Sequence, residues 1–312
     1  MTIAQTVEQY IQHKRSLGMK FDSPAVILRS FARAAGDAMP DDFDAEQVHA
    51  FLFGCGTSAQ TAIQKWSTLR GLYRFALARG IATTSPLPVR MPRVSETLMP
   101  HIYDADELRY LLQTVVHLPL SKLQPHTVQA MLLVLYGAAL RIGEAVRLVI
   151  SDVDFVNMLL KIRVSKFYKD RLVPIGGDLA PVLQSYAATR QCLGHSDEDS
   201  APFFVSDAGD RITIQLAEQA FRRLRELAKV NREDGGHFQP CLHGLRHSFA
   251  VHRLVEWYKA GSDVNLMLPK LSTFLGHLQV SYTQRYLTMT PELLQEASSR
   301  FEAFAKPEGS HE

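Results

Sequence analysis

The chain of 312 residues has little cysteine and no long hydrophobic run. Its cysteines, Cys55, Cys192 and Cys241, are odd in number and widely spaced, which fits no disulfide framework or metal ribbon and suits a reducing compartment. The longest apolar run, Ala130 to Leu140, is too short to span a bilayer, and the N-terminal MTIAQTVEQYIQHKR lacks the apolar core of a signal peptide. We therefore expect a cytoplasmic protein that makes no use of a membrane.

Acidic residues are missing from one long stretch, between Glu46 and Glu96. The basic residues in that stretch are Lys65, Arg70, Arg74, Arg79, Arg90 and Arg93. The net charge of the whole chain is only +2, so total charge alone does not suggest nucleic acid. The local asymmetry does, because cations without acidic partners favour a surface that faces phosphates. A solvated basic helix face is the alternative interpretation.

The hydrophobic content of 46% indicates a globular chain, and its length suffices for two domains. Apolar residues at helical spacing predict four helices in residues 1 to 93, the second with Val26, Ile27, Phe31 and Ala34 facing inward. Residues 94 to 103 belong to a proline-rich stretch without periodicity, which predicts a linker. A second domain, residues 104 to 312, then opens with Asp104 as a helix cap.

The second domain is expected to be mainly helical with one small antiparallel hairpin, which places the chain in the α+β class. Residues 124 to 140 predict a buried helix that ends at Arg141, and residues 243 to 257 predict another helix. The short runs LLKIRVS and RLVPI, around residues 166 to 170, predict the hairpin. From Pro291 to about residue 305, apolar residues at three- and four-residue steps predict a tail helix.

Several chemically capable side chains follow one another along the second domain. They are Arg141 in ALRIGE, Lys166 in SKFYKDR, His243 and Arg246 in HGLRH, and His277 and Tyr286 in LGHLQVSYTQRYL. Each has an ordinary structural explanation, such as a helix-end arginine, a hairpin surface charge, a buried histidine or a packing tyrosine. Together they are a set able to attack a phosphodiester without a metal.

The set resembles the tyrosine recombinases, also called the phage integrase family, across nearly the whole chain. Arg141 matches the first catalytic arginine, Glu144 its accompanying acid, Lys166 the hairpin lysine, His243 and Arg246 the H-x-x-R box, His277 the L-G-H box, and Tyr286 the nucleophile. The sequence departs from the family between Arg246 and His277, which are 31 residues apart, with a surplus around residues 257 to 270. The segment after Tyr286 resembles integrases of transposon-like mobile elements.

The resemblance implies a fold and an activity. Residues 1 to 93 would be a helical core-binding (SAM-like) DNA-binding domain, with contacts from Lys65, Arg70, Arg74 and Arg79, and residues 104 to 312 the catalytic domain. The protein would be a site-specific recombinase that cuts double-stranded DNA through a covalent 3′-phosphotyrosine, without cofactor or metal. It would act as a tetramer over two DNA sites, with the tail reaching a neighbouring protomer. Whether companion recombinases take part is left open.

The reaction assigns each residue a role. A phenol, with a pKa of about 10, needs a base or electrostatic help to act as a nucleophile. Arg141 and Arg246 would clamp the nonbridging oxygens, because guanidinium offers a planar bidentate fork, and His277 would add a hydrogen bond. His243 would be the base and Lys166 the acid for the leaving oxygen. By resemblance, Glu144 orients the pocket.

Three alternatives remain at this point. Tyr282 is a rival nucleophile one helical turn before Tyr286, although its spacing from His277 does not match the family. His243 and His247 are four residues apart and could bind zinc, but the glutamate of H-E-x-x-H is lacking. A DNA-binding accessory protein could keep the fold without cutting, although it would not need the complete catalytic set.

Overall fold

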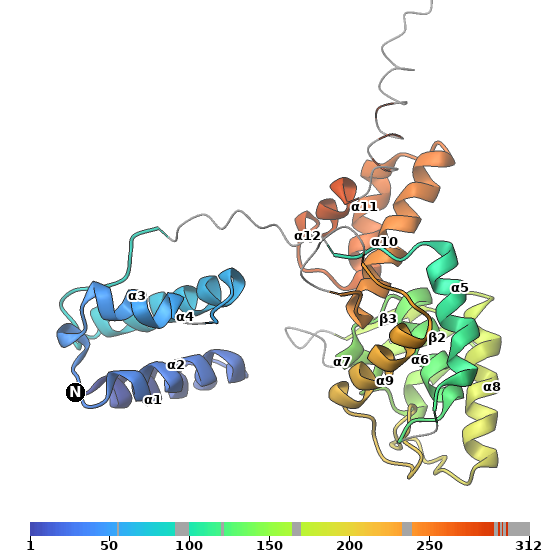
Figure 1. Cartoon of the computed structure of the whole chain (residues 1–312), viewed down its shortest axis with the longest axis horizontal. Helices are drawn as coiled ribbons and strands as arrows, with labels where there is room; N and C mark the ends of the chain where they lie inside the picture. The colour runs from blue at the N-terminus through green and yellow to red at the C-terminus, as the bar shows by residue number, and fades with distance from the viewer. Residues whose placement is uncertain are drawn as a thin grey trace, which may run out of the picture. The chain divides into compact units, whose positions relative to one another are not determined.

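The computed structural model describes residues 1–54, 56–90, 100–119, 122–163, 170–232 and 239–289, together with Leu293, Gln295 and Ser298. The chain divides into two compact units, Met1–Thr97 and Leu98–Glu312. Figure 1 shows the first unit in blue and the second in green to red. Each unit has its own hydrophobic core, so each is considered by itself.

The first unit is built from four α-helices: α1 (Ile3–Ser16), α2 (Asp22–Ala35), α3 (Ala45–Phe53) and α4 (Ala59–Ala78), with a short 3-10 turn η1 (Pro40–Asp42). Side-chain caps start three of them, since Thr2, Asp44 and Ser58 accept hydrogen bonds from backbone N–H groups of the first turn. The core centres on Phe31, whose ring meets Phe43 and Phe51 edge-on. The predicted four helices are therefore present.

One predicted helix face in this unit is wrong. Val26 is 67% exposed and Ala34 is also exposed, whereas Ala25, Leu28 and Phe31 are buried. The helix begins at Asp22, after Phe21 in a left-handed conformation, and Phe21 packs edge-on against Tyr10 of α1. This packing sets the rotation of α2 about its own axis, so the buried face differs from the one that the spacing of apolar residues predicts.

The second unit contains six long helices within the described residues: α5 (Ala105–Thr114), α6 (Pro125–Gly137), α8 (Leu179–Cys192), α9 (Ile214–Leu227), α10 (Leu242–Lys259) and α11 (Val264–Leu275). The short helix α7 (Ile142–Ala145) follows α6. The shorter turns of this unit are η2 (Val115–His117), η3 (Ile150–Asp152), α12 (Ser281–Gln284) and η4 (Arg285–Thr288). The apolar helix α6 is central, because α8, α9 and α10 all pack on it (Figure 1).

A three-stranded antiparallel sheet lies beside these helices, in the order β1 (Val153–Asp154), β2 (Leu159–Ile162) and β3 (Arg171–Pro174). Leu160 pairs with Val173, and both are fully buried. The predicted small antiparallel sheet is confirmed, with β1 as a strand that the sequence did not reveal. The chain is thus mainly helical with a small sheet, as expected.

The predicted helix of residues 124 to 140 ends early. The structure ends α6 at Gly137, and Ala139 then adopts a left-handed conformation with φ of 49°. This turn separates α6 from α7, so Arg141 is not the last residue of a long helix. It is the N-cap of the next one.

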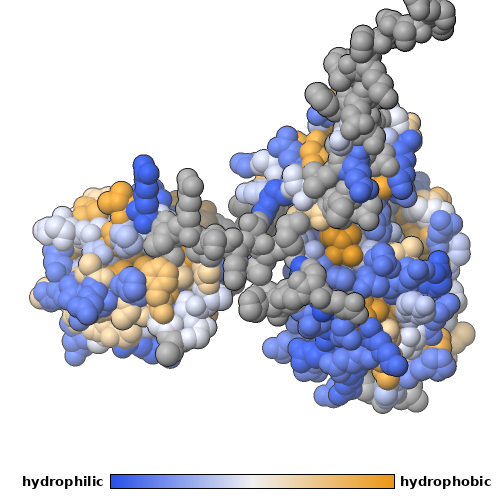
Figure 2. Space-filling model, turned by 45° about the horizontal axis from the view of Figure 1, so that its top comes forward, coloured by the Kyte–Doolittle hydropathy of each residue, from blue (hydrophilic) through white to orange (hydrophobic). Residues whose placement is uncertain are grey.

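Figure 2 shows a largely hydrophilic face on the second unit, on which hydrophobic residues form only small patches. None of the helices within the described ranges combines the length and the apolar character that crossing a membrane requires.

Candidate active site

One cavity of about 430 Å³ in the second unit collects most of the predicted site. Its lining includes Arg141, His243, Arg246, His277 and Tyr286, and also His247, Tyr282 and Arg285. These residues come from the start of α7, the first two turns of α10, the turn after α11, α12 and η4. The fold therefore brings together five of the predicted catalytic residues, which are separated by up to 145 positions in the sequence.

Arg141 is held by the helix that it caps. Its backbone N–H donates to Oε2 of Glu144 at 2.9 Å, and its Nη1 donates to Oε1 of the same carboxylate at 2.8 Å. Its Nη2 donates to the carbonyl of Gly276 at 3.3 Å. The guanidinium remains about a third exposed, toward the cavity, so further N–H groups are free to meet a ligand.

Glu144 lies behind Arg141 and is buried. Arg171, from the start of β3, donates from both terminal nitrogens to the Glu144 carboxylate, each at 2.9 Å. Burial raises the pKa of Glu144, but the hydrogen bonds and charges of Arg171 and Arg141 outweigh it and bring the pKa to about 2. Glu144 is therefore an anion that orients two arginines. The orienting role of Glu144 in the reaction stays a prediction.

Arg246 is the most deeply placed cation of the cavity, with 1% of its surface exposed. Its Nη1 donates to the carbonyl of Ala139 and its Nη2 to the carbonyl of Leu275. Burial lowers the pKa of Arg246 to about 10, with a contribution from the nearby charge of Arg141, so the side chain stays protonated at neutral pH. The left-handed turn at Ala139 therefore directs the Ala139 carbonyl toward the Arg246 guanidinium.

Tyr286 is 3% exposed and faces the cavity. Its hydroxyl lies 2.9 Å from Nδ1 of His247, and the charge of Arg246 is close enough to act on it. The ring stacks on His277, with centroids 6.3 Å apart and planes 18° apart. Burial raises the pKa of Tyr286, and the positive charges of Arg246 and Arg141 oppose that rise.

Tyr282, the rival phenol, is placed differently. Its side chain is 51% exposed, and it meets His277 edge-on at 6.3 Å. It lies at the rim of the same cavity. Of the two tyrosines, Tyr286 is therefore the one enclosed among the cations.

The histidines of the cavity are neutral at physiological pH. Burial and the charges of Arg246 and Arg141 lower the pKa of His277 to about 4, and its Nδ1 lies 2.8 Å from the hydroxyl of Thr283. Burial also lowers the pKa of His243. The pKa of His247 falls to about 3, because of burial and the charges around it. A bound anion would counteract these shifts.

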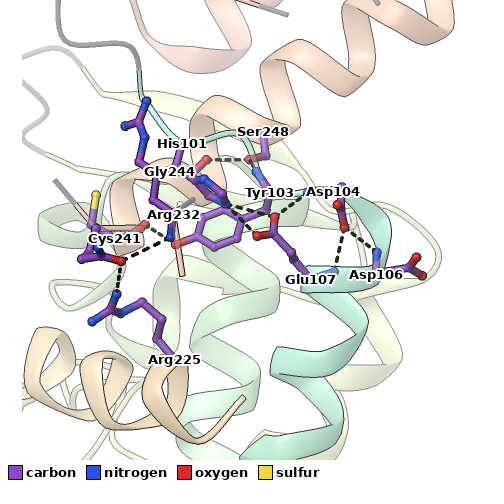
Figure 3. Close-up of polar contacts among 11 residues, drawn as sticks. His101, Tyr103, Asp104, Asp106, Glu107, Arg225, Arg232, Cys241, Gly244 and Ser248 are labelled. Carbon is purple, nitrogen blue, oxygen red and sulfur yellow. Dashed lines mark hydrogen bonds and ion pairs between the residues drawn. The ribbon is translucent and has the colours of Figure 1, made fainter. Parts of the chain in front are cut away.

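The first residues of the second unit fix the start of α10. The N–H of Tyr103 donates to the Ser248 hydroxyl at 2.7 Å, and the Tyr103 hydroxyl donates to the carbonyl of Cys241 at 3.0 Å (Figure 3). A Cβ on Gly244 would lie 2.8 Å from the Tyr103 ring, so the glycine of HGLRH allows this close approach. The His101 ring and the backbone N–H of Asp104 both hydrogen-bond the Glu107 carboxylate, so this segment is also held to α5.

Lys166 lies in residues 164–169, which are outside the described residues, so its predicted role stays a prediction. The predicted DNA-contacting residues all belong to the first unit, on or just after α4. The Lys65 ammonium donates to the carbonyl of Phe51 at 2.7 Å and to the Thr57 hydroxyl at 3.2 Å, so it is largely engaged within the unit. Arg70 lies over the Trp66 ring at 5.1 Å.

Arg74 and Arg79 border a groove of about 530 Å³ between α1 and α4. Lys14 and His13 of α1 line its other side, and Arg79 lies over the Phe75 ring at 4.5 Å. Lys14 and His13 were not singled out from the sequence, because they are remote from the acid-free segment. Together these side chains give the groove a positive lining.

No group of three or more His, Cys, Asp or Glu side chains suited to hold a metal ion occurs among the residues that the structure describes. His243 and His247 do lie together, with ring centroids 4.4 Å apart, but as an edge-to-face pair. The residues that the structure describes therefore offer no set of ligands for the zinc alternative.

Sequence reasoning missed two side chains of the site. Arg171 could have been found from the strand pattern, because in RLVP it shares a face with the buried Val173, and an arginine on a buried face needs a carboxylate. His247 was considered only as a zinc ligand. Its spacing of four from His243 placed it on the same helix face, which was the available signal.

Known proteins match this fold and these motifs. Residues 102–292 match the model of the phage integrase family. The protein y4rB of Sinorhizobium fredii, named as an integrase/recombinase, is 33% identical over 96% of this chain and 97% of its own length.

Two solved structures share the fold at low identity. The Tn1549 transposon integrase in complex with transposon right-end DNA has a TM-score of 0.73 and 17% identity, and the match covers 98% of this chain and 100% of that one. A lambda integrase tetramer bound to a Holliday junction has a TM-score of 0.68 and 20% identity, with 92% and 77% covered. From its sequence match and its fold, the chain belongs to the phage integrase family, the tyrosine recombinases.

Proposed function

We propose that the protein cuts and rejoins double-stranded DNA through a covalent bond between Tyr286 and a DNA 3′-phosphate. The observation that carries this proposal is the enclosure of the Tyr286 hydroxyl in one cavity with Arg141, Arg246 and His277. Two guanidinium groups and an imidazole around a phenol match the charge that builds on a phosphodiester under attack. Because DNA is the substrate, we place the protein in the cytoplasm.

The roles of the residues follow from their contacts. Arg141 and Arg246 hold the nonbridging oxygens with the N–H groups that their internal hydrogen bonds leave free. His277 adds a hydrogen bond from the ring nitrogen that does not face Thr283. His243 lines the phosphate pocket, and Lys166 protonates the 5′-oxygen as it leaves. The phosphotyrosine conserves the energy of the broken ester, so rejoining needs no nucleotide cofactor.

We propose that the biological reaction is integration, excision or transposition of a mobile element. The similarity to y4rB and to the fold of the Tn1549 integrase supports this assignment. The lambda integrase tetramer on a Holliday junction supports a tetramer of this chain over two paired DNA sites.

The tail has a more specific place in this proposal. Leu293 is 1% exposed and packs in the cluster of α10 and α11, so the apolar stripe begins on its own unit. The rest of the predicted helix, up to about residue 305, lies outside the described residues apart from Gln295 and Ser298. We propose that this remaining part links protomers on DNA. Deleting residues 299–312 should then abolish assembly on paired sites in native gels while single-site binding survives. Normal assembly would contradict the proposal.

The activity is tested with a nicked suicide substrate, which traps the covalent protein–DNA adduct because the cleaved strand end diffuses away. The probe is DNA from the ends of the element that flanks the gene. The wild-type protein should give an adduct, Tyr286→Phe should give none while binding DNA normally, and the matched control Tyr282→Phe should retain it. Wild-type protein that binds without forming an adduct would instead indicate the accessory-protein alternative.

A further inference from the structure

The Tyr286 hydroxyl needs a partner that can remove its proton, and the sequence assigned that task to His243. The structure places a different histidine against it. Nδ1 of His247 lies 2.9 Å from the hydroxyl, within ordinary hydrogen-bond distance, whereas His243 packs edge-on against His247 with ring centroids 4.4 Å apart.

We propose that His247 accepts the proton of Tyr286 as the phenol attacks DNA. This inference rests on the proposed function, because it takes Tyr286 as the nucleophile.

The direction of the hydrogen bond follows from the other neighbour of the phenol. Arg246 places a positive charge beside the Tyr286 hydroxyl, and a positive charge attracts the lone pairs of the oxygen and repels its proton. The phenol oxygen therefore turns its lone pairs toward Arg246, and the phenol proton points at Nδ1 of His247. His247 then carries its own proton on Nε2. The arrangement directs the phenol proton to a nitrogen that can take it.

The surroundings keep that nitrogen free in the resting protein. His247 is faced by His243 and Arg246 on its own helix, by His277 after α11, and by Arg285 and Tyr286 of η4. Burial and these charges hold the pKa of His247 low, so its lone pair is available. A DNA phosphodiester bound by the arginines brings a negative charge into the same cavity. That charge raises the basicity of His247 at the moment when a base is required.

In the proposed step a bond forms between the phenol oxygen and phosphorus, the phenol O–H bond breaks, and its proton moves to Nδ1 of His247. The bond from phosphorus to the 5′-oxygen breaks, and that oxygen takes a proton from the separate acid assigned to Lys166. In the rejoining step a DNA 5′-hydroxyl attacks the phosphotyrosine and gives its proton to the neutral amine left on Lys166, while the bond from phosphorus to the phenol oxygen breaks and the leaving phenolate takes the proton back from His247.

The same helix supplies a matched control pair. Nδ1 of His252 lies 2.9 Å from the hydroxyl of Tyr136, in the cavity between α6, α8 and α10. This pair has the same atoms at the same distance as His247 and Tyr286, but it is outside the active-site cavity. Loss of a His–Tyr hydrogen bond from α10 can thus be compared at both places.

The test measures single-turnover adduct formation on the nicked substrate with saturating protein. His247→Asn keeps a hydrogen-bond acceptor near the position of Nδ1 but cannot take a proton, whereas His247→Ala removes both. We expect each variant to react roughly 100-fold or more slowly, within the range for general base catalysis, while binding DNA as before. Added imidazole should restore a measurable part of the rate to His247→Ala. His252→Asn should react like the wild type.

A near-wild-type rate for His247→Asn would overturn the inference, because it would reduce His247 to a positioning residue. A failure of imidazole to rescue His247→Ala would also overturn it. An equal loss in His252→Asn would also overturn it, because the effect would then be general to the helix. If Tyr286→Phe still forms an adduct, the proposed function fails instead. A dead Tyr286→Phe with a fully active His247→Asn removes only the inference.

Discussion

The two units of the chain place charge in opposite ways. In the first unit Arg70, Arg74 and Arg79 are exposed, and two of them lie over aromatic rings, Arg70 over Trp66 and Arg79 over Phe75. In the second unit Glu144 and Arg246 are buried and hydrogen-bonded. Exposed cations cost little to place and meet any phosphate backbone, whereas buried charges are costly but fixed in direction. We therefore expect the first arrangement to suit the holding of DNA and the second to suit a reaction with it.

The largest expected effect concerns the buried anion. Glu144→Gln leaves Arg171 without its carboxylate, so we expect a loss of about 3–5 kcal/mol in the free energy of unfolding at pH 7, measured by urea denaturation. Because the folded-state pKa of Glu144 is about 2 and its ordinary value is 4.5, its stabilisation is complete above about pH 5 and fades as the pH falls toward 2. The difference between the two proteins should shrink over that interval. A constant difference would contradict the depressed pKa.

The next prediction separates the geometry of the active-site arginines from their charge. Arg246→Lys keeps the charge but cannot reach both carbonyls and a phosphate as a planar fork does. We expect adduct formation to slow by a factor of about 100 or more, equal to about 3 kcal/mol, with single-site DNA binding nearly unchanged. Arg141→Lys should behave in the same way. Near-wild-type cleavage by either variant would remove that residue from the phosphate clamp.

A smaller effect is expected in the first unit, where charge alone should matter. Replacing Arg70 and Arg74 by Ala should weaken binding to all DNA sequences alike and reduce the slope of log affinity against log salt by about two. Replacing both by Lys should leave the slope unchanged, in contrast to the lysine variants of the active site. An unchanged slope in the alanine variant would return α4 to the solvated-face interpretation.

The smallest effect should come from Lys65. Its ammonium already bonds the Phe51 carbonyl and the Thr57 hydroxyl, and it lies 4.7 Å from the Phe51 ring. Lys65→Ala should therefore cost about 1 kcal/mol of stability and lower the salt slope by clearly less than one counterion. A full unit of slope, in the same titration, would show that Lys65 binds phosphate despite these contacts.

Much of the site could be read from the sequence, because Arg141, His243, Arg246, His277 and Tyr286 occur in motifs whose order is informative. The contacts that organise it could not. The pairing of Arg171 with Glu144 joins residues 27 positions apart, and the bond from Arg246 to Ala139 depends on a turn inside a stretch that reads as continuous helix. Local patterns specify periodicity, while these partners depend on tertiary packing. The exposure of Val26 has the same origin.

The attachment of Tyr103 has a mechanical consequence. Its N–H bonds Ser248 on the helix that bears His243 and Arg246, and Pro100, three residues earlier, lines the cavity itself. The segment that begins the described part of the second unit therefore lies at the active-site cavity. A pull along the chain would load the contacts that this segment makes with α10, among them the hydrogen bond between Tyr103 and Ser248. If the first unit binds DNA as we expect, a force on that unit would reach the helix that carries His243 and Arg246 through these contacts.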